Sequence, residues 1–220
     1  FTYASSPVTG GIWYEDPPGG KNVPTTDPDW ASNSITYLDN LYGSHGPFDG
    51  VLGYSQGGAM SIVYMAENVS RFGFAVILCG YLPETHLGLM GKIDTASPLN
   101  VPSLFYSGTQ DAIIPTSLTV QASTKFVSAK VMQDQGGHVP PQSGYALETL
   151  ANYILSNNKS AFVVNGSASD HKHDDDEDSK DVVLGPGEIA AIAIGTVTGS
   201  ILLVYGIRQL YGNKKYIYNS

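Results

Sequence analysis

The feature that most constrains this chain is a Gly-x-Ser-x-Gly motif between an apolar segment and a helix-forming segment. Gly53, Ser55 and Gly57 follow the apolar residues 50–52, and residues 56–67 carry apolar side chains at helical spacing. A strand-to-helix turn this tight leaves no room for a Cβ on either side of the serine. The bend lifts the hydroxyl out of the sheet and points the helix N-terminus at it, as in a nucleophile elbow. Because the chain has 25 glycines, the motif alone also arises by chance, and its context carries the prediction.

Apolar segments alternate with helix-forming segments through residues 1–158. Strands are expected at 1–4, 50–53, 74–79, 101–107 and 129–132, and helices at 56–67, 115–127 and 144–155. The run at 74–79 is apolar without interruption, as in a parallel strand covered on both faces. This alternation predicts an α/β fold with a mostly parallel sheet, whose functional groups gather at the carboxyl ends of the strands.

Two residues have the properties needed to activate Ser55. Asp111 and His138 each follow a predicted strand, and a Gly-Gly pair precedes the histidine. A serine hydroxyl needs a base at neutral pH, and His138 would take its proton and later return it to the leaving group. Asp111 would hold the imidazole tautomer and stabilise its charged form. The order serine, aspartate, histidine is that of the α/β-hydrolases. The alternative is that Asp111 only caps a helix and His138 is an ordinary loop residue.

Other residues have weaker claims on the site. His45 and His86 are expected at the surface, and residues 82–96 form a segment that could cover the site. Asp49 and Asp94 do not follow a strand at the required place. An apolar acyl pocket is predicted to be lined by Tyr54, Tyr81, Leu82 and Leu87.

Composition excludes several functional classes. The net charge of −9 leaves no basic face for nucleic acid. The single cysteine, Cys79, excludes an internal disulfide framework and is expected to be a small buried apolar residue. No metal or cofactor site is predicted, because His171 and His173 stand among carboxylates without further ligands to fix a geometry.

Beyond residue 158 the composition changes twice. Residues 159–187 are polar and acidic and predict a disordered linker. Residues 188–208 predict one transmembrane helix, because their uncharged stretch 189–207 would be about 30 Å long. Arg208, Lys214 and Lys215 place the tail, residues 209–220, on the cytoplasmic side. The first domain, residues 1–158, would then face a lumen or the outside.

Two short patterns accompany the membrane prediction. Asn158 and Asn165 stand in Asn-x-Ser sequences and are candidates for N-glycosylation, whereas Asn68 matches the pattern close to the predicted core. Gly195 and Gly199 have the spacing that lets two membrane helices approach closely, which offers a route to a homodimer.

Three motifs together resemble the FSH family of serine hydrolases. They are residues 48–57 around Ser55, the pattern Gly108-x-x-Asp111-x-x-x-Pro115, and the Gly-Gly-His-x-Pro sequence that contains His138. The resemblance covers roughly residues 1–156. It implies an α/β-hydrolase fold and a carboxylic-ester hydrolase, without a cofactor, whose catalytic residues are Ser55, Asp111 and His138. The elbow is also similar to that of acyl-protein thioesterases, although the motif around the histidine favours the first family.

The chain departs from this family in two respects. Family members begin with a strand and a His-Gly loop that donates one backbone N–H to the oxyanion, whereas this chain opens at what resembles the second strand. The N–H of Gln56 would supply one donor, and loss of the other lowers turnover by about 10²–10³-fold. The acidic linker and the membrane span are the second departure.

Two hypotheses on function follow. The first is a membrane-anchored esterase that acts on a small or medium acyl ester. The second is a catalytically impaired, hydrolase-like membrane protein that serves as an interaction module. The absence of the first strand favours the second hypothesis, and the presence of Ser55, Asp111 and His138 favours the first.

Overall fold

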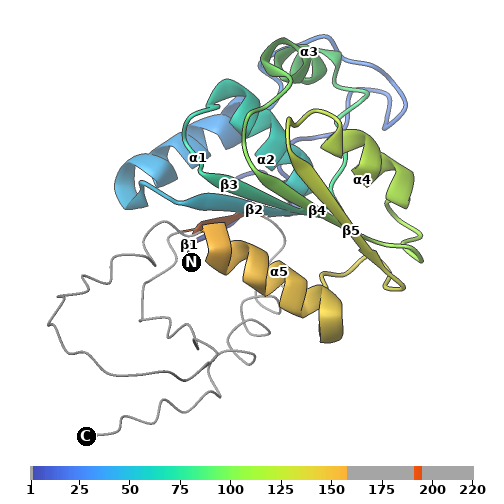
Figure 1. Ribbon diagram of the computed structural model, residues 1–220. Coiled ribbons are helices and arrows are strands. Elements are labelled where there is room, and N and C mark those ends of the chain that lie inside the picture. Colours follow the sequence, from blue (N-terminus) through green and yellow to red (C-terminus); the bar gives the residue numbers. More distant parts are fainter. Residues whose placement is uncertain (1, 158–190, 195–220) are drawn as a thin grey trace, which may run out of the picture.

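The computed structural model describes residues 2–157 and 191–194, and these residues form a single parallel sheet flanked by helices (Figure 1). The strand order is β1-β6-β2-β3-β4-β5, and every neighbouring pair is parallel. The strands are β1 (Thr2–Ala4), β2 (Gly50–Tyr54), β3 (Phe74–Leu78), β4 (Ser103–Gly108), β5 (Ala129–Asp134) and β6 (Ala191–Ile194). The predicted α/β architecture with a mostly parallel sheet is confirmed.

Helices cover both faces of the sheet. Helix α5 (Gly144–Asn157) lies on one face and the other four lie on the opposite face (Figure 1). These four are α1 (Ser32–His45), α2 (Gln56–Glu67), α3 (Leu87–Ala96) and α4 (Thr116–Ser123). The helix expected at 56–67 has those bounds, whereas α4 is shorter than the expected 115–127. Helix α1 was not predicted, although Ile35, Leu38, Leu41 and Tyr42 stand at helical spacing in the sequence and pack on the core under α1–α4.

Two apolar cores follow from the alternation of side chains along the central strands. In β2, Val51 belongs to the core under α1–α4, and Leu52 belongs to the core under α5. Ala75 and Val76 divide in the same way in β3. Full burial of one such large apolar side chain stabilises the fold by about 1.5–3 kcal/mol. The central strands are therefore fixed from both sides, and their carboxyl ends are held in place.

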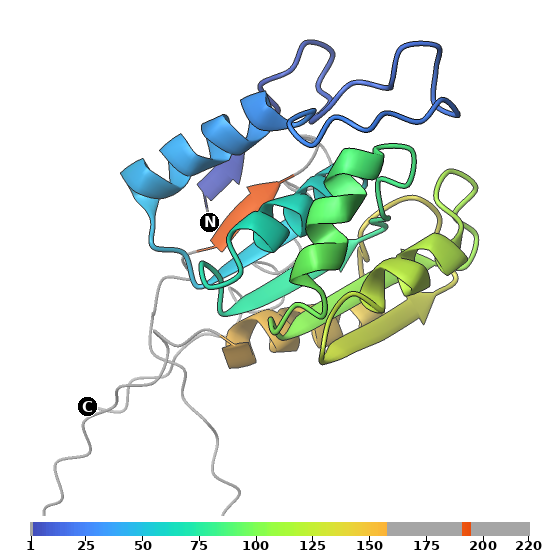
Figure 2. The ribbon, with the colours of Figure 1, turned by 90° about the horizontal axis from the view of Figure 1, so that it is seen from above.

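The strand β6 corrects the prediction of a transmembrane helix at residues 188–208. Ala191–Ile194 is a strand between β1 and β2, where Ile192 lies opposite Thr2 on one side and Val51 on the other (Figure 2). A central parallel strand and a membrane helix both require an uncharged apolar run, so hydropathy alone does not separate them. No helix within residues 2–157 or 191–194 is long and apolar enough to cross a membrane.

Several predictions concern residues outside the described ranges. The linker at 159–187, the rest of the expected span, the tail at 209–220, and Asn158, Asn165, Gly195 and Gly199 all lie there. The linker, the tail, the glycosylation candidates and the glycine pair stay predictions. Members of the resembled family have a first strand that this sequence lacks. In the structure, β6 occupies the position in the sheet next to β2.

Candidate active site

Ser55 sits on the sharp turn that joins β2 to α2. Its backbone has φ 55° and ψ −125°, a region that non-glycine residues rarely adopt. A Cβ on Gly53 would lie 2.6 Å from the carbonyl oxygen of Gly57 and 2.7 Å from Cα of Gly58. The Ser55 N–H donates to the carbonyl of Leu78 at 2.9 Å, which ties the turn to the end of β3. The predicted elbow is therefore present. Glycine is needed at position 53 because a Cβ there would clash with the start of α2.

The serine, histidine and aspartate predicted from the sequence meet at the carboxyl edge of the sheet. Nε2 of His138 lies 2.9 Å from Oγ of Ser55, and Nδ1 lies 2.7 Å from Oδ2 of Asp111. The three residues follow β2, β4 and β5, which brings together positions up to 83 residues apart. One imidazole thus bridges a hydroxyl and a carboxylate, the arrangement through which a proton can leave the hydroxyl.

The carboxylate of Asp111 is held as an anion. Its side chain is fully buried, and Oδ1 accepts hydrogen bonds from the N–H groups of Ile113 and Ile114 at 2.9 and 2.8 Å. Burial favours the protonated form, but these two donors and His138 outweigh burial and hold the pKa of Asp111 below its ordinary value. The second oxygen remains directed at the imidazole.

The loop that carries His138 is held by contacts from β4 and from the end of β5. Gly108 backs onto this loop so closely that a Cβ there would lie 2.0 Å from the carbonyl oxygen of Gly136. Asp134 accepts hydrogen bonds from the Gly136 N–H at 2.7 Å and from the Tyr106 hydroxyl at 2.8 Å. These contacts fix the loop without using the imidazole itself.

Tyr54 adds a further contact to the histidine loop. Its hydroxyl donates to the carbonyl of His138 at 2.7 Å, and the two rings lie 5.2 Å apart. Burial, with smaller effects from Cys79 and Asp111, raises the pKa of Tyr54 to about 12, so the hydroxyl keeps its proton and remains a donor. The sequence indicated an aromatic residue beside the nucleophile but not this bond, which joins residues 84 positions apart.

The four predicted pocket residues differ in their packing and exposure. Tyr54 packs in the core under α5, whereas Tyr81 and Leu82 pack with the core on the opposite face. Leu87, the first residue of α3, is 48% exposed. The prediction of one acyl pocket lined by these four residues stays a prediction.

Gln56 has two distinct contacts at the elbow. As the first residue of α2, it has a backbone N–H that the helix does not use, at the position expected for an oxyanion donor. Its side chain accepts from the Trp13 N–H at 2.7 Å and donates to the Tyr14 carbonyl at 2.9 Å. The side chain therefore fastens the N-terminal segment to the elbow.

The N-terminal segment lines a pocket of about 290 Å³ beside α1. Its walls include aromatic and acidic residues, among them Trp13, Tyr14, Glu15, Asp27, Asp29 and Trp30. None of its lining residues is Ser55, Asp111 or His138. Two of its lining residues, Trp13 and Tyr14, are the ones whose backbone bonds the side chain of Gln56.

His86 is not the surface residue that the sequence suggested. It is 3% exposed, and its Nε2 lies 2.9 Å from the carbonyl oxygen of Glu15, with the ring of Tyr14 packed edge-on at 4.8 Å. Burial follows from a long-range contact, since residues 25 and 86 form a bridge between two loops. His45 is exposed, as predicted, and Asp94 forms an ion pair with Lys125 at 2.6 Å.

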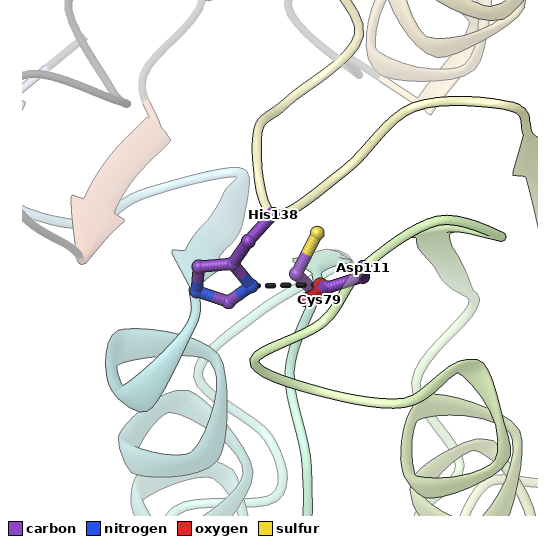
Figure 3. A group of neighbouring side chains, drawn as sticks. All are labelled: Cys79, Asp111 and His138. Atoms are coloured by element: carbon purple, nitrogen blue, oxygen red, sulfur yellow. Dashed lines mark hydrogen bonds and ion pairs between the residues drawn. The ribbon is translucent and has the colours of Figure 1, made fainter.

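Cys79 is buried, as predicted, but it has polar neighbours. The residue follows β3, and its sulfur lies beside Asp111 and His138 (Figure 3). Burial, and then the nearby charge of Asp111, raises the pKa of the thiol to about 12. No sequence pattern predicts this proximity, because Cys79 stands inside an apolar run.

A family model described as serine hydrolase (FSH1) matches residues 11–150, well over half of the chain. The chain belongs to this family. The resemblance noted in the sequence is confirmed, and the parallel sheet with its elbow is the α/β-hydrolase fold that the family implied.

Relatives that this chain resembles are named as esterases. Esterase OVCA2 from Bos taurus is 37% identical over 102 residues, which cover 44% of each chain. Esterase OVCA2 from Mus musculus is 35% identical over 123 residues, covering 53% of this chain and 51% of the relative. The chain spans about half the length of these relatives.

Solved structures with similar folds are more distant. A structure of a variant of Arabidopsis thaliana SOBER1 is 18% identical, with a TM-score of 0.48, and the match covers 67% of this chain and 75% of that chain. Est1E from Butyrivibrio proteoclasticus is 14% identical, with a TM-score of 0.46, and the match covers 57% and 70% of the two chains.

Proposed function

We propose that this protein hydrolyses a carboxylic ester or thioester through a catalytic triad of Ser55, His138 and Asp111. The observation that carries the proposal is the unbroken chain of short contacts from Oγ of Ser55 through the imidazole to Oδ2 of Asp111. Membership of a serine hydrolase family and the esterase names of two relatives agree with this reaction class.

In the acylation step, Oγ of Ser55 attacks the ester carbonyl while Nε2 of His138 takes the hydroxyl proton. The ionised Asp111 stabilises the imidazolium through Nδ1. The negative charge on the tetrahedral intermediate lies at the N-terminus of α2, where the N–H of Gln56 donates to it. Collapse of the intermediate breaks the ester C–O bond, and His138 protonates the departing alcohol.

Deacylation repeats these steps with water. His138 accepts a proton from the water as it attacks the acyl-serine, and returns that proton to Oγ of Ser55 as the acid leaves. The substrate we propose is a small or medium acyl ester. The alternative, a catalytically impaired interaction module, gives no reason for a buried, ionised Asp111 to be matched to the histidine that faces Ser55.

A fluorophosphonate probe tests the proposal directly, because it reacts covalently with an activated serine. We expect the probe to label the protein and Ser55→Ala to abolish both labelling and hydrolysis of p-nitrophenyl esters. Ser44→Ala is a matched control, because Ser44 is an exposed serine on α1 and should not affect labelling. Labelling that survives in Ser55→Ala would contradict the proposed nucleophile.

A further inference from the structure

Three metal-ligating side chains converge beside the proposed triad. The Cys79 sulfur, a carboxylate oxygen of Asp111 and a ring nitrogen of His138 all lie within 4.8 Å of one another (Figure 3). They come from the segments that follow β3, β4 and β5, so three separate strand ends aim their ligand atoms at one point. Ester hydrolysis as proposed above uses the aspartate and the histidine but gives the thiol no role.

The donor set matches that of a thiophilic divalent cation. Thiolate, imidazole and carboxylate are the ligands of Zn²⁺, and soft thiolates favour Zn²⁺ or Cd²⁺ over Mg²⁺ or Ca²⁺. Tetrahedral bonds of about 2.0–2.3 Å place ligand atoms about 3.3–3.8 Å apart. The observed spacing requires the Cys79 sulfur to move inward by about 1 Å or less, and the 2.7 Å contact between Asp111 and His138 to open slightly.

The surroundings favour capture of a cation. Oδ1 of Asp111 stays bonded to two backbone N–H groups, which leaves Oδ2 as the oxygen available to a metal. The carbonyl oxygen of Val139 lies 4.0 Å from the Cys79 sulfur and adds a further dipole facing the group. Cys79 and Asp111 are buried, whereas the side chain of His138 is 13% exposed and marks the side from which an ion can enter.

We infer that Cys79, Asp111 and His138 form an inhibitory site for a thiophilic divalent cation such as Zn²⁺. A metal bound to Nδ1 of His138 replaces the proton that this nitrogen shares with Asp111. That proton moves to Nε2, the thiol proton is released to solvent, and the sulfur binds as thiolate. Because Nε2 then carries a proton, it cannot accept the proton of Ser55, and hydrolysis stops.

The inhibitory consequence rests on the proposed function, but occupancy of the site can be measured without it. Cys79 is the single cysteine of the chain, so the ultraviolet charge-transfer absorption of a Cd²⁺–thiolate bond reports this site alone. We expect Cd²⁺ to produce this absorption with one ion per chain and to inhibit hydrolysis over the same concentrations, reversibly on addition of EDTA. In Cys79→Ser the absorption should vanish, and inhibition should require at least about 100-fold more Cd²⁺.

Inhibition is expressed relative to the metal-free rate of each variant, so a change in basal activity does not affect the comparison. Replacement of His171 and His173 by alanine is the matched control, because these residues offer the other histidine-rich sequence that could hold a metal. This control should keep both the absorption and the inhibition. Absence of the absorption in the wild-type protein, or equal inhibition of Cys79→Ser, overturns the inference. If the metal-free protein hydrolyses no ester but the absorption appears, the metal site stands and the proposed function fails.

Discussion

The two halves of the site are built in different ways. The elbow, residues 53–57, packs mainly against its own helix, since Gly53 lies against the first turn of α2 and Ser61 donates to the Gly57 carbonyl at 2.7 Å, while a longer-range bond joins the Ser55 N–H to Leu78. The histidine loop, residues 135–139, has a local bond from the Gly136 N–H to Asp134 and is otherwise held from a distance by Gly108 and Tyr54, which lie on other strands.

This difference separates stability from activity. A change in the elbow alters the junction between a central strand and a buried helix, so the fold and the nucleophile should fail together. The histidine loop lies at the sheet edge over β4 and is partly exposed, so it can shift while both cores remain packed. Substitutions in the elbow should therefore lower both stability and activity, whereas substitutions in the histidine loop should lower activity alone.

The largest loss of activity with the fold intact is expected from Asp111→Asn. Asparagine keeps an oxygen for the N–H groups of Ile113 and Ile114, but it removes the charge that faces His138. The imidazole then loses its preferred tautomer, and turnover should fall by about 10⁴-fold. Steady-state hydrolysis of a p-nitrophenyl ester measures this loss, and near-wild-type activity would contradict the role of Asp111.

The pH dependence of stability provides a control on the same variant. Because the pKa of Asp111 is lower in the folded state, the unfolded chain binds more protons between the folded and unfolded pKa values. The resulting stability is present above the ordinary pKa near 4 and is lost as the pH falls through the lowered value. Urea unfolding below about pH 4 should therefore show a smaller loss of stability for Asp111→Asn than for the wild type.

A methyl group added on each half tests the comparison most directly. In Gly108→Ala the new Cβ meets the Gly136 carbonyl, and the histidine loop must move outward by about 1 Å, which should lower turnover by about 10²-fold. In Gly53→Ala the Cβ meets the backbone of α2, and the free energy of unfolding should fall by about 3 kcal/mol together with activity. Urea unfolding and ester hydrolysis are measured on both variants.

Gly91→Ala serves as the control for these methyl additions. Gly91 is an exposed position in α3 where a Cβ has no neighbour within 4 Å. The variant should gain about 0.5–1 kcal/mol from helix propensity without a change in turnover. The distinction between the halves fails if Gly108→Ala unfolds as readily as Gly53→Ala.

The same distinction explains what the sequence could predict. Ser55 and the bounds of α2 follow from a local motif, and Asp111 and His138 follow from their positions after strands. The burial of His86 depends on a loop contact 61 residues away, and no local pattern encodes it. Sequence patterns thus identified the three side chains that meet at the edge of the sheet, but not the contacts that hold them there.

The strand β6 shows the same limit for the fold. Its apolar residues fit the sequence pattern of a membrane helix as well as that of a central strand. Each of these two kinds of element is surrounded by an apolar environment and therefore needs an uninterrupted apolar sequence. Whether such a segment becomes a helix or a strand depends on whether two strands formed much earlier in the chain leave room for a strand between them. β6 pairs with β1 and β2 across such a gap.

The smallest effect is expected from Tyr54→Phe, and it tests how the histidine loop is held. Loss of the hydroxyl removes one hydrogen bond to the His138 carbonyl, worth about 1 kcal/mol, and should lower turnover by about five-fold. Since the bond positions the base rather than the substrate, the loss should appear in kcat and be equal for esters of every acyl length. If Tyr54 instead lined an acyl pocket, as its place beside Ser55 first suggested, KM would change with acyl length. Tyr153→Phe is the matched control, because this buried hydroxyl in the same core has no hydrogen-bond partner among the described residues, and its removal should leave kcat unchanged.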